Sequence, residues 1–206
     1  KQVIEQGSTH AIAHTTLNLA ADIDLGEYLW KPVTEFYGDF CGNGHVISNM
    51  KIIEDDNSPS SYGFFAFYRG STSENRSTIS DLTFQDPYIE CADGVYGVLA
   101  ASIFCASVRN CGVNNGTLLQ YNHQVNVAQR GLTGGGLIGR VVTADISNCY
   151  AVGTLTSMNY ACTDVNGGFI GNMEGSDCSL TNNYCSVRVI AEAGWTGSIC
   201  AYMAGG

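Results

Sequence analysis

Hydrophobic and polar residues alternate along most of the chain in short runs, a pattern of β-strands rather than helices. In residues 17–25 every second position is Leu, Ala or Ile, and Gly26 ends the run. A period of two places alternate side chains on one face of a strand. We therefore expect a strand over residues 17–25, and similar runs separated by Gly, Asn, Asp and Ser continue to the C-terminus.

A glycine followed by two apolar residues recurs through the chain, most clearly as Gly136-Leu137-Ile138-Gly139. The spacings between its occurrences are 34, 39, 32 and 29 residues. A near-constant period of this length indicates a repeat architecture. The occurrences begin at Gly63, Gly97, Gly136, Gly168 and Gly197.

A second recurring element is an apolar residue, any residue, and then Asn or Asp, usually followed by another apolar residue. Its spacings are 32, 29, 38 and 34 residues, so it keeps step with the glycine element. The Asn or Asp positions are Asn49, Asp81, Asn110, Asn148 and Asn182.

Together the two elements predict an all-β fold, a parallel β-helix (β-solenoid) of about five coils in which each repeat makes one coil of short strands. The recurring Asn or Asp then occupies the same corner of every coil, where stacked side chains can hydrogen-bond. Cys111 and Cys149 follow that corner and would stack as small buried thiols. We expect a single domain over residues 1–206, with leader strands in 1–46 and repeats in 47–206.

Unequal spacings place insertions in loops on the outside, of which Arg69–Ser77 and Gln120–Gly131 are the longest. Asn43-Gly44 predicts a tight corner because both residues tolerate positive φ. The glycine-rich run at residues 131–136 lacks the Lys of a phosphate loop and is expected to form a turn.

The amino-acid composition argues against several classes of protein. The chain has 206 residues, 45% hydrophobic and 14% charged, which argues against disorder. A net charge of −10 repels phosphate backbones and anionic lipids, so we expect no nucleic-acid partner. No apolar run approaches the roughly 18–20 residues that span a bilayer, so we expect no membrane insertion.

Cysteine and histidine usage predicts no metal site and no cofactor. The nine Cys include no C-x-x-C pair, and the four His are scattered, which is unlike a structural zinc site. An odd number of Cys leaves at least one thiol free or paired between chains. Two sequons, at Asn75 and Asn115, are candidate glycosylation sites and favour a secreted chain. Because the chain begins at Lys1 without a signal peptide, we interpret it as a mature or excised piece.

The segments Gly136-Leu137-Ile138-Gly139 and Gly168-Phe169-Ile170-Gly171, each followed by a segment like Ile146–Gly153, resemble the GLUG repeat. The upstream residues 22–25, 30–32 and 40–49 resemble the leader of such repeats, so the resemblance runs from about residue 17 to the end. The closing glycine is replaced at Ala66, Ala100 and Cys200.

This resemblance implies a right-handed parallel β-helix of large secreted or surface-attached microbial proteins. These include adhesin-like proteins and the non-catalytic part of immunoglobulin A metallopeptidases. The repeat carries no known active site, so it transfers no functional residues.

The alternative is a glycan-acting β-helix enzyme, whose chemistry would need carboxylates on an outer strand face. Asp22 and Asp24 would share such a face about 7 Å apart, but a solvated strand face explains them better. Glu54-Asp55-Asp56 lacks the ligand order of a calcium loop. His45 follows Asn43-Gly44 and is interpreted as a turn residue.

The chain ends in the glycine half of a unit, and its first Asn half has no glycine half before it. Open coil ends expose strand edges, so we expect self-association head to tail into a filament, unless the protein continues past Gly206. The function expected is a non-enzymatic structural or adhesive module with no catalytic residues, located outside the cell or on its surface. Its partners would be host or environmental glycans or proteins, and the third alternative is an accessory domain of a larger secreted peptidase.

Overall fold

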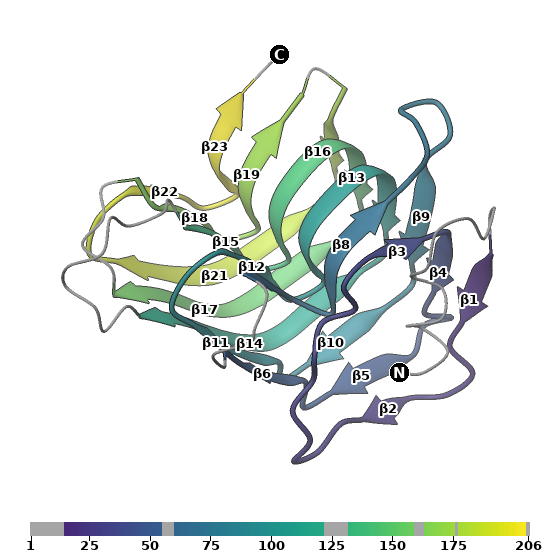
Figure 1. The fold of residues 1–206 in the computed structure, drawn as a ribbon, viewed down its shortest axis with the longest axis horizontal. Coiled ribbons are helices and arrows are strands. Elements are labelled where there is room, and N and C mark those ends of the chain that lie inside the picture. The colour runs from purple at the N-terminus through teal and green to yellow at the C-terminus, as the bar shows by residue number, and fades with distance from the viewer. Residues whose placement is uncertain (1–14, 55–59, 122–131, 159–162, 176, 205–206) are drawn as a thin grey trace.

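The computed structural model describes residues 15–54, 60–121, 132–158, 163–175 and 177–204. In these residues the chain forms parallel strands and no helix, and the coils stack from the purple N-terminal strands to the yellow C-terminal ones (Figure 1). Hence the described residues contain no helix that could cross a membrane. The fold is a β-solenoid of about four turns, which confirms the expected fold class with one turn fewer than expected.

Each turn passes through three sheets, and the largest of them, sheet A, has ten strands. Positive φ at Cys105 and Thr143 bends the two long strands of the middle coils. The other coils cross sheet A as two shorter strands on either side of that bend. The strands of sheet A are β1 (Thr16–Asn18), β3 (Phe36–Tyr37), β4 (Asp39–Cys41), β8 (Phe65–Arg69), β9 (Ser77–Ser80), β13 (Ala100–Arg109), β16 (Ile138–Ser147), β19 (Ile170–Glu174), β20 (Ser179–Thr181) and β23 (Cys200–Ala204).

Sheet B has eight strands and sheet C has five, and the five strands of sheet C delimit the four complete turns. Sheet B contains β2 (Ile23–Asp24), β5 (Val46–Ser48), β6 (Lys51–Ile53), β10 (Thr83–Gln85), β11 (Tyr88–Cys91), β14 (Gly112–Tyr121), β17 (Tyr150–Met158) and β21 (Tyr184–Ala191). Sheet C contains β7 (Ser61–Tyr62), β12 (Val95–Gly97), β15 (Thr133–Gly135), β18 (Val165–Gly167) and β22 (Trp195–Gly197). The run at residues 131–136 was therefore wrongly expected to be only a turn, because Thr133–Gly135 pair with β12 and β18.

The core is a narrow column of apolar side chains from alternate positions. Ile103 and Val108 of β13 and Val113 and Leu118 of β14 are at most 2% exposed. Side chains buried this fully each contribute about 1.5–3 kcal/mol. Because every coil is too thin to bury its own apolar face, the column exists only when neighbouring coils stack.

The glycines of the repeat allow sheet C to pack directly against sheet A of the next coil. A Cβ on Gly97 would lie 2.5 Å from the backbone nitrogen of Gly139, and one on Gly135 would lie 2.8 Å from that of Gly171. The glycine in register with Gly97 is thus Gly135 rather than Gly136. The alignment expected from the sequence was off by one residue here, because a Gly-Gly pair fits the pattern in either register.

The corner between sheets A and B carries the recurring Asn or Asp. Asp81, Asn110, Asn148 and Asn182 all have φ between 53° and 56°, a left-handed conformation that Asn and Asp tolerate better than other side chains. Asn49 was wrongly placed in this series, because Ile47 pairs with Phe84. Asn49 belongs to a second corner inside sheet B, with Asp86 (φ 52°) and Asn115 (φ 53°).

The expected continuous strand over residues 17–25 is wrong, because the chain turns from sheet A to sheet B within it. β1 pairs with β4, whereas β2 pairs with β5. The alternation persists across the corner because both strands contribute every second residue to the same core. These leader residues are therefore already part of the solenoid stack.

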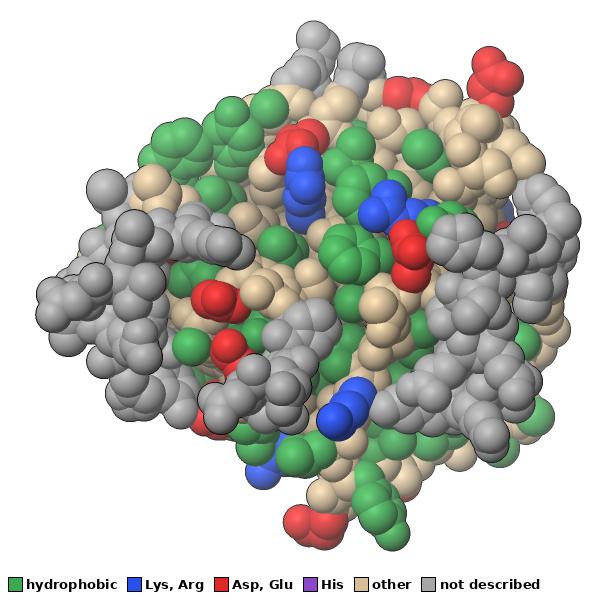
Figure 2. All heavy atoms as spheres, in the orientation of Figure 1, with side chains coloured by type: hydrophobic (Ala, Val, Ile, Leu, Met, Phe, Trp, Pro, Cys, Tyr) green, Lys and Arg blue, Asp and Glu red, His purple; other side chains and the backbone are tan. Residues whose placement is uncertain are grey.

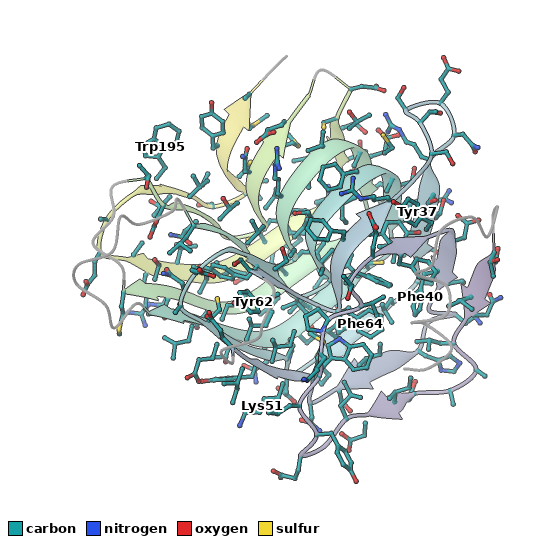
Figure 3. All side chains as sticks on the ribbon, in the orientation of Figure 1. Tyr37, Phe40, Lys51, Tyr62, Phe64 and Trp195 are labelled. Atoms are coloured by element: carbon teal, nitrogen blue, oxygen red, sulfur yellow. The ribbon has the colours of Figure 1, made fainter. Side chains whose placement is uncertain are left out.

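The two ends of the core differ. At the N-terminal end Trp30 stacks on Phe64, with 4.8 Å between ring centroids, and donates its indole N–H to the Phe64 carbonyl oxygen at 3.1 Å. Phe40 packs edge-on against Phe64 with 5.7 Å between ring centroids, and Phe36 packs against Phe40 at 6.3 Å, so aromatic rings fill this end of the column (Figure 3 labels Phe40 and Phe64). At the C-terminal end Ile199 and Met203 are 41% and 66% exposed, whereas Phe169 and Met173 at the same positions one coil earlier are 0% and 7% exposed.

Candidate functional site

The corner carboxylates are bound to amides of neighbouring coils. Asn110 donates from Nδ2 to Asp81 Oδ1 at 2.8 Å, and Asn115 donates in the same way to Asp86 at 2.6 Å. The expected ladder of stacked side chains is confirmed for Asp81 and Asn110, whereas the Asp86–Asn115 pair was not expected from the sequence. The hydrogen bond from Asn115 lowers the pKa of the Asp86 carboxyl.

Asp22 and Asp24, the carboxylates considered for catalysis, accept hydrogen bonds from residues of the next coil, next to β2 of sheet B. Asp22 Oδ1 accepts the backbone N–H of Val46 and lies 3.0 Å from His45 Nδ1. Asp24 Oδ1 accepts from Asn49 Nδ2 at 2.8 Å and from the Gly26 N–H. The Val46 and Asn49 hydrogen bonds lower the pKa of Asp22 and Asp24, respectively.

His45 follows the turn at Asn43-Gly44, as expected, and donates its backbone N–H to the Gly42 carbonyl oxygen. Glu54 accepts the backbone N–H of Ala92, whereas Asp55 and Asp56 lie outside the described residues. Among the residues that the structure describes, no three His, Cys, Asp or Glu side chains are grouped so as to hold a metal ion.

The outer face of sheet A carries a row of polar and aromatic side chains that runs along the solenoid. Near its N-terminal end Arg69 pairs with Glu35 at 2.5 Å, and Tyr37 donates its hydroxyl to the same carboxylate at 2.9 Å. The Arg69 guanidinium lies 4.2 Å from the ring centroid of Phe104, one coil further along. Phe104 is thus held between coils by a cation–π contact.

The row continues from Phe104 towards the C-terminus. The Arg140 guanidinium lies 6.0 Å from the ring centroid of Phe104. It also binds Glu174 with two hydrogen bonds, of 2.6 and 3.3 Å. Asn172 Nδ2 donates to the same carboxylate at 2.6 Å. The Arg140 hydrogen bond lowers the pKa of Glu174. Figure 2 shows blue and red spheres in contact among green ones on this face.

An exposed aromatic pair ends the row. Trp195 of β22 stacks on Tyr202 of β23, with ring centroids 4.9 Å apart and planes 28° apart. Trp195 is 54% exposed and projects away from the ribbon (Figure 3). We did not expect this pair from the sequence. The available signal was an aromatic residue at the outward position that Val95, Thr133 and Val165 occupy in earlier coils.

The insertion after β8 is an exposed loop, which confirms its expected outward position. Arg76, at its end, pairs with Asp145 and, at 2.7 Å, with Asp177. These partners belong to coils two and three positions further along the stack, and the Arg76 side chain is only 11% exposed. The second long insertion lies largely outside the described residues.

Cys111 and Cys149 stack on adjacent coils in the core, as expected, and both are free. The Cys111 backbone N–H donates to Cys149 Sγ at 3.3 Å, and burial raises the pKa of the Cys111 thiol. In the next coil Asn183 takes the corresponding position. Its side chain accepts the Cys149 N–H and donates to the Ile146 carbonyl oxygen, both at 2.9 Å, which explains the polar residue in this repeat.

The two sequons lie in different surroundings. Asn75 is exposed in the loop after β8. The side chain of Asn115 is also exposed, but its amide nitrogen, the atom that carries an N-linked glycan, is committed to Asp86. Glycosylation at either position stays a prediction.

Comparison with known proteins supports the fold. No protein-family model matches the chain, and no curated protein sequence matches it. The chain is similar to a solved structure from Bacteroides ovatus named a "putative immunoglobulin A1 protease", with a TM-score of 0.57 and 17% sequence identity. The match covers 98% of this chain and 80% of that one. At this identity the likeness shows a shared β-solenoid fold and fits the GLUG resemblance loosely.

Proposed function

We propose that the chain is a non-enzymatic β-solenoid module of a secreted or surface protein, built from GLUG-like repeats. The observation that carries this proposal is that its corner and outer-face carboxylates bind side chains of neighbouring coils. Asp24, Asp86 and Glu174 each accept a hydrogen bond from a cross-coil donor. An acid–base pair would instead need two carboxyl groups directed at one reacting bond.

The module would serve as an accessory domain of a larger protein, where rigid length and an exposed lateral face are useful properties. The fold shared with the Bacteroides ovatus protein supports this role. An adhesive role follows from the same geometry, because each coil adds one more residue to the rows on its outer face.

We also propose that the chain associates with further copies through its solenoid ends. The exposed core positions Ile199 and Met203 at one end, and Ile23 (37% exposed) at the other, support it. Among the residues that the structure describes, the first and last strands of each sheet are paired on one side only, and such edges favour the pairing of a further coil.

Incubation of the purified chain with polysaccharides and with immunoglobulin A1 tests the non-enzymatic assignment. We expect no reducing sugar and no peptide fragment above the level of a boiled sample of the same chain. Release of either product, reduced in the D22N or D24N variant, would support the glycan-acting enzyme instead.

A further inference from the structure

We propose that the row on the outer face of sheet A, from Phe104 to the Trp195–Tyr202 pair, binds a neutral oligosaccharide lying along the solenoid axis. The inference rests on the adhesive role proposed above and names the ligand class and the residues that would contact it. We call Phe104, Arg140, Asn172, Glu174, Tyr202 and Trp195 the binding row.

The binding row consists of two neighbouring lines of outward positions on sheet A, and Trp195 of sheet C joins it by stacking on Tyr202. Arg140 pairs with Asn172, and Asn172 with Tyr202. Phe104 and Glu174 both lie in register with Val142 of β16. Adjacent strands are about 4.8 Å apart, so the row presents a chemical group at each coil to an extended ligand.

The chemistry of the row suits sugar hydroxyls. A hydroxyl both donates and accepts hydrogen bonds, and the row offers donors on Arg140 and acceptors on Glu174 within one hydrogen-bonded group. The flat face of Trp195 can pack against the C–H face of a sugar ring, to which the negative face of an aromatic ring is attracted. Rigid aromatic side chains beside planar polar groups are typical binding anchors.

The charges of the binding row and of the whole chain favour a neutral ligand. Glu35 and Glu174 balance Arg69 and Arg140, so the row and its N-terminal extension carry no net charge locally. The chain as a whole has a net charge of −10, which disfavours an anionic polysaccharide.

A peptide fits this face less well. Extended peptides commonly bind by adding a strand to a free sheet edge. Under the binding row, β13, β16 and β19 each have a paired strand on both sides. The backbone groups of these three strands are therefore already bonded, so recognition by Phe104, Arg140 and Glu174 must come from their side chains.

The exposure of the aromatic pair follows from its position on the outer face. Trp195 is in register with Val165, and Tyr202 with Asn172, which are outward-facing positions in the coil before. Met203, the next residue, is by contrast a core position left exposed at the C-terminal end.

Affinity electrophoresis through native gels containing laminarin, yeast mannan, glucomannan or xylan tests the proposal, with alginate as the anionic control. We expect at least one neutral polysaccharide to retard the chain and alginate not to do so. Trp195→Ala should weaken that binding at least tenfold. Tyr184→Ala, which removes another exposed aromatic ring of the same coil on sheet B, should leave it unchanged.

Absence of retardation by every neutral polysaccharide would overturn the inference, as would equal binding of the Trp195→Ala and Tyr184→Ala variants. Unchanged thermal unfolding of both variants shows that the fold is kept. A negative binding result does not affect the proposal of a non-enzymatic module, because that proposal is tested by product release in a separate experiment. Binding accompanied by release of sugar would support the oligosaccharide-binding site but contradict the proposal that the module is non-enzymatic.

Discussion

Close packing of the backbone requires glycine at the repeat positions. A Cβ on Gly135 would lie 1.9 Å from the carbonyl oxygen of Ile138 in addition to its contact with Gly171. No rotation of a side chain relieves such a contact, because every atom involved belongs to the backbone.

We therefore predict that Gly135→Ala lowers the free energy of unfolding by about 2–3 kcal/mol. Chemical denaturation monitored by circular dichroism measures it. The matched control is Gly26→Asn, because no atom lies within 4 Å of a Cβ there and Asn tolerates its φ of +52°. A control change above about 0.5 kcal/mol, or an equal effect of both substitutions, would contradict the packing argument.

The corner carboxylates make stability depend on pH. The pKa of Asp86 is lowered in the folded chain, so the unfolded chain binds its proton more readily, and stability rises with pH in the acid range. This contribution is complete well above the ordinary value of 3.8 and is lost as the pH falls through the lower folded pKa.

We predict that the melting temperature of the wild-type chain falls as the pH is lowered from about 5 to about 2.5. Asp86→Asn should melt lower at pH 7 and lose less on acidification, because one of the titrating groups is gone. Parallel melting curves for the two proteins across this range would show that Asp86 contributes nothing to the acid response.

At the scale of the elements, the loop after β8 is held to the sheet by one arginine. Arg76 contacts carboxylates of two further coils, so its side chain joins three coils of the stack. Because its side chain is 11% exposed, solvent screens these ion pairs less than it does a pair on the open surface.

The side chains of Asp145 and Asp177 are 50% and 63% exposed, so Arg76→Gln should lower the free energy of unfolding by about 1 kcal/mol. Hydrogen exchange should also become faster in the loop at residues 70–75 and in β9. Arg109→Gln removes an exposed arginine from the same sheet and serves as the control, with a change below about 0.5 kcal/mol. Equal effects of the two substitutions would argue against a role for the cross-coil ion pairs.

At the scale of the whole molecule, the two ends of the solenoid are not equivalent. The N-terminal edges are strands of two or three residues beneath aromatic rings, whereas the C-terminal edge includes the eight residues of β21 and the five of β23. Short edges resist pairing with other chains, and long ones favour it.

We predict that light scattering detects association that increases with concentration, and that Met203→Asp reduces it by placing a charge on the exposed core position. Met158→Asp is the control, because Met158 is 51% exposed at the end of β17, a strand that is paired on both sides, by β14 and β21. A wild-type chain that stays monomeric at all concentrations would sink the proposal of self-association.

Much of the fold could be predicted from local rules. Alternation of apolar residues predicts strands, and Asn or Asp at positive φ predicts corners, because both depend on the backbone conformation of a few residues. Several errors concern alignment between coils: Gly136 and Gly168 were chosen over Gly135 and Gly167, and Asn49 was placed in the wrong corner. Others concern where a strand ends, as in residues 17–25, which turn from one sheet to the next.

The sequence by itself determined that this chain is a stack of β-coils with Asn or Asp at the corners, since period two and the left-handed conformation are local properties. Only the tertiary structure decided which outward side chains meet. Arg69, Phe104 and Arg140 are separated by 35 and 36 residues and become neighbours through the register of the buried core. Insertions of varying length between the coils conceal that register in the sequence, so the binding row became visible only when the coils were stacked.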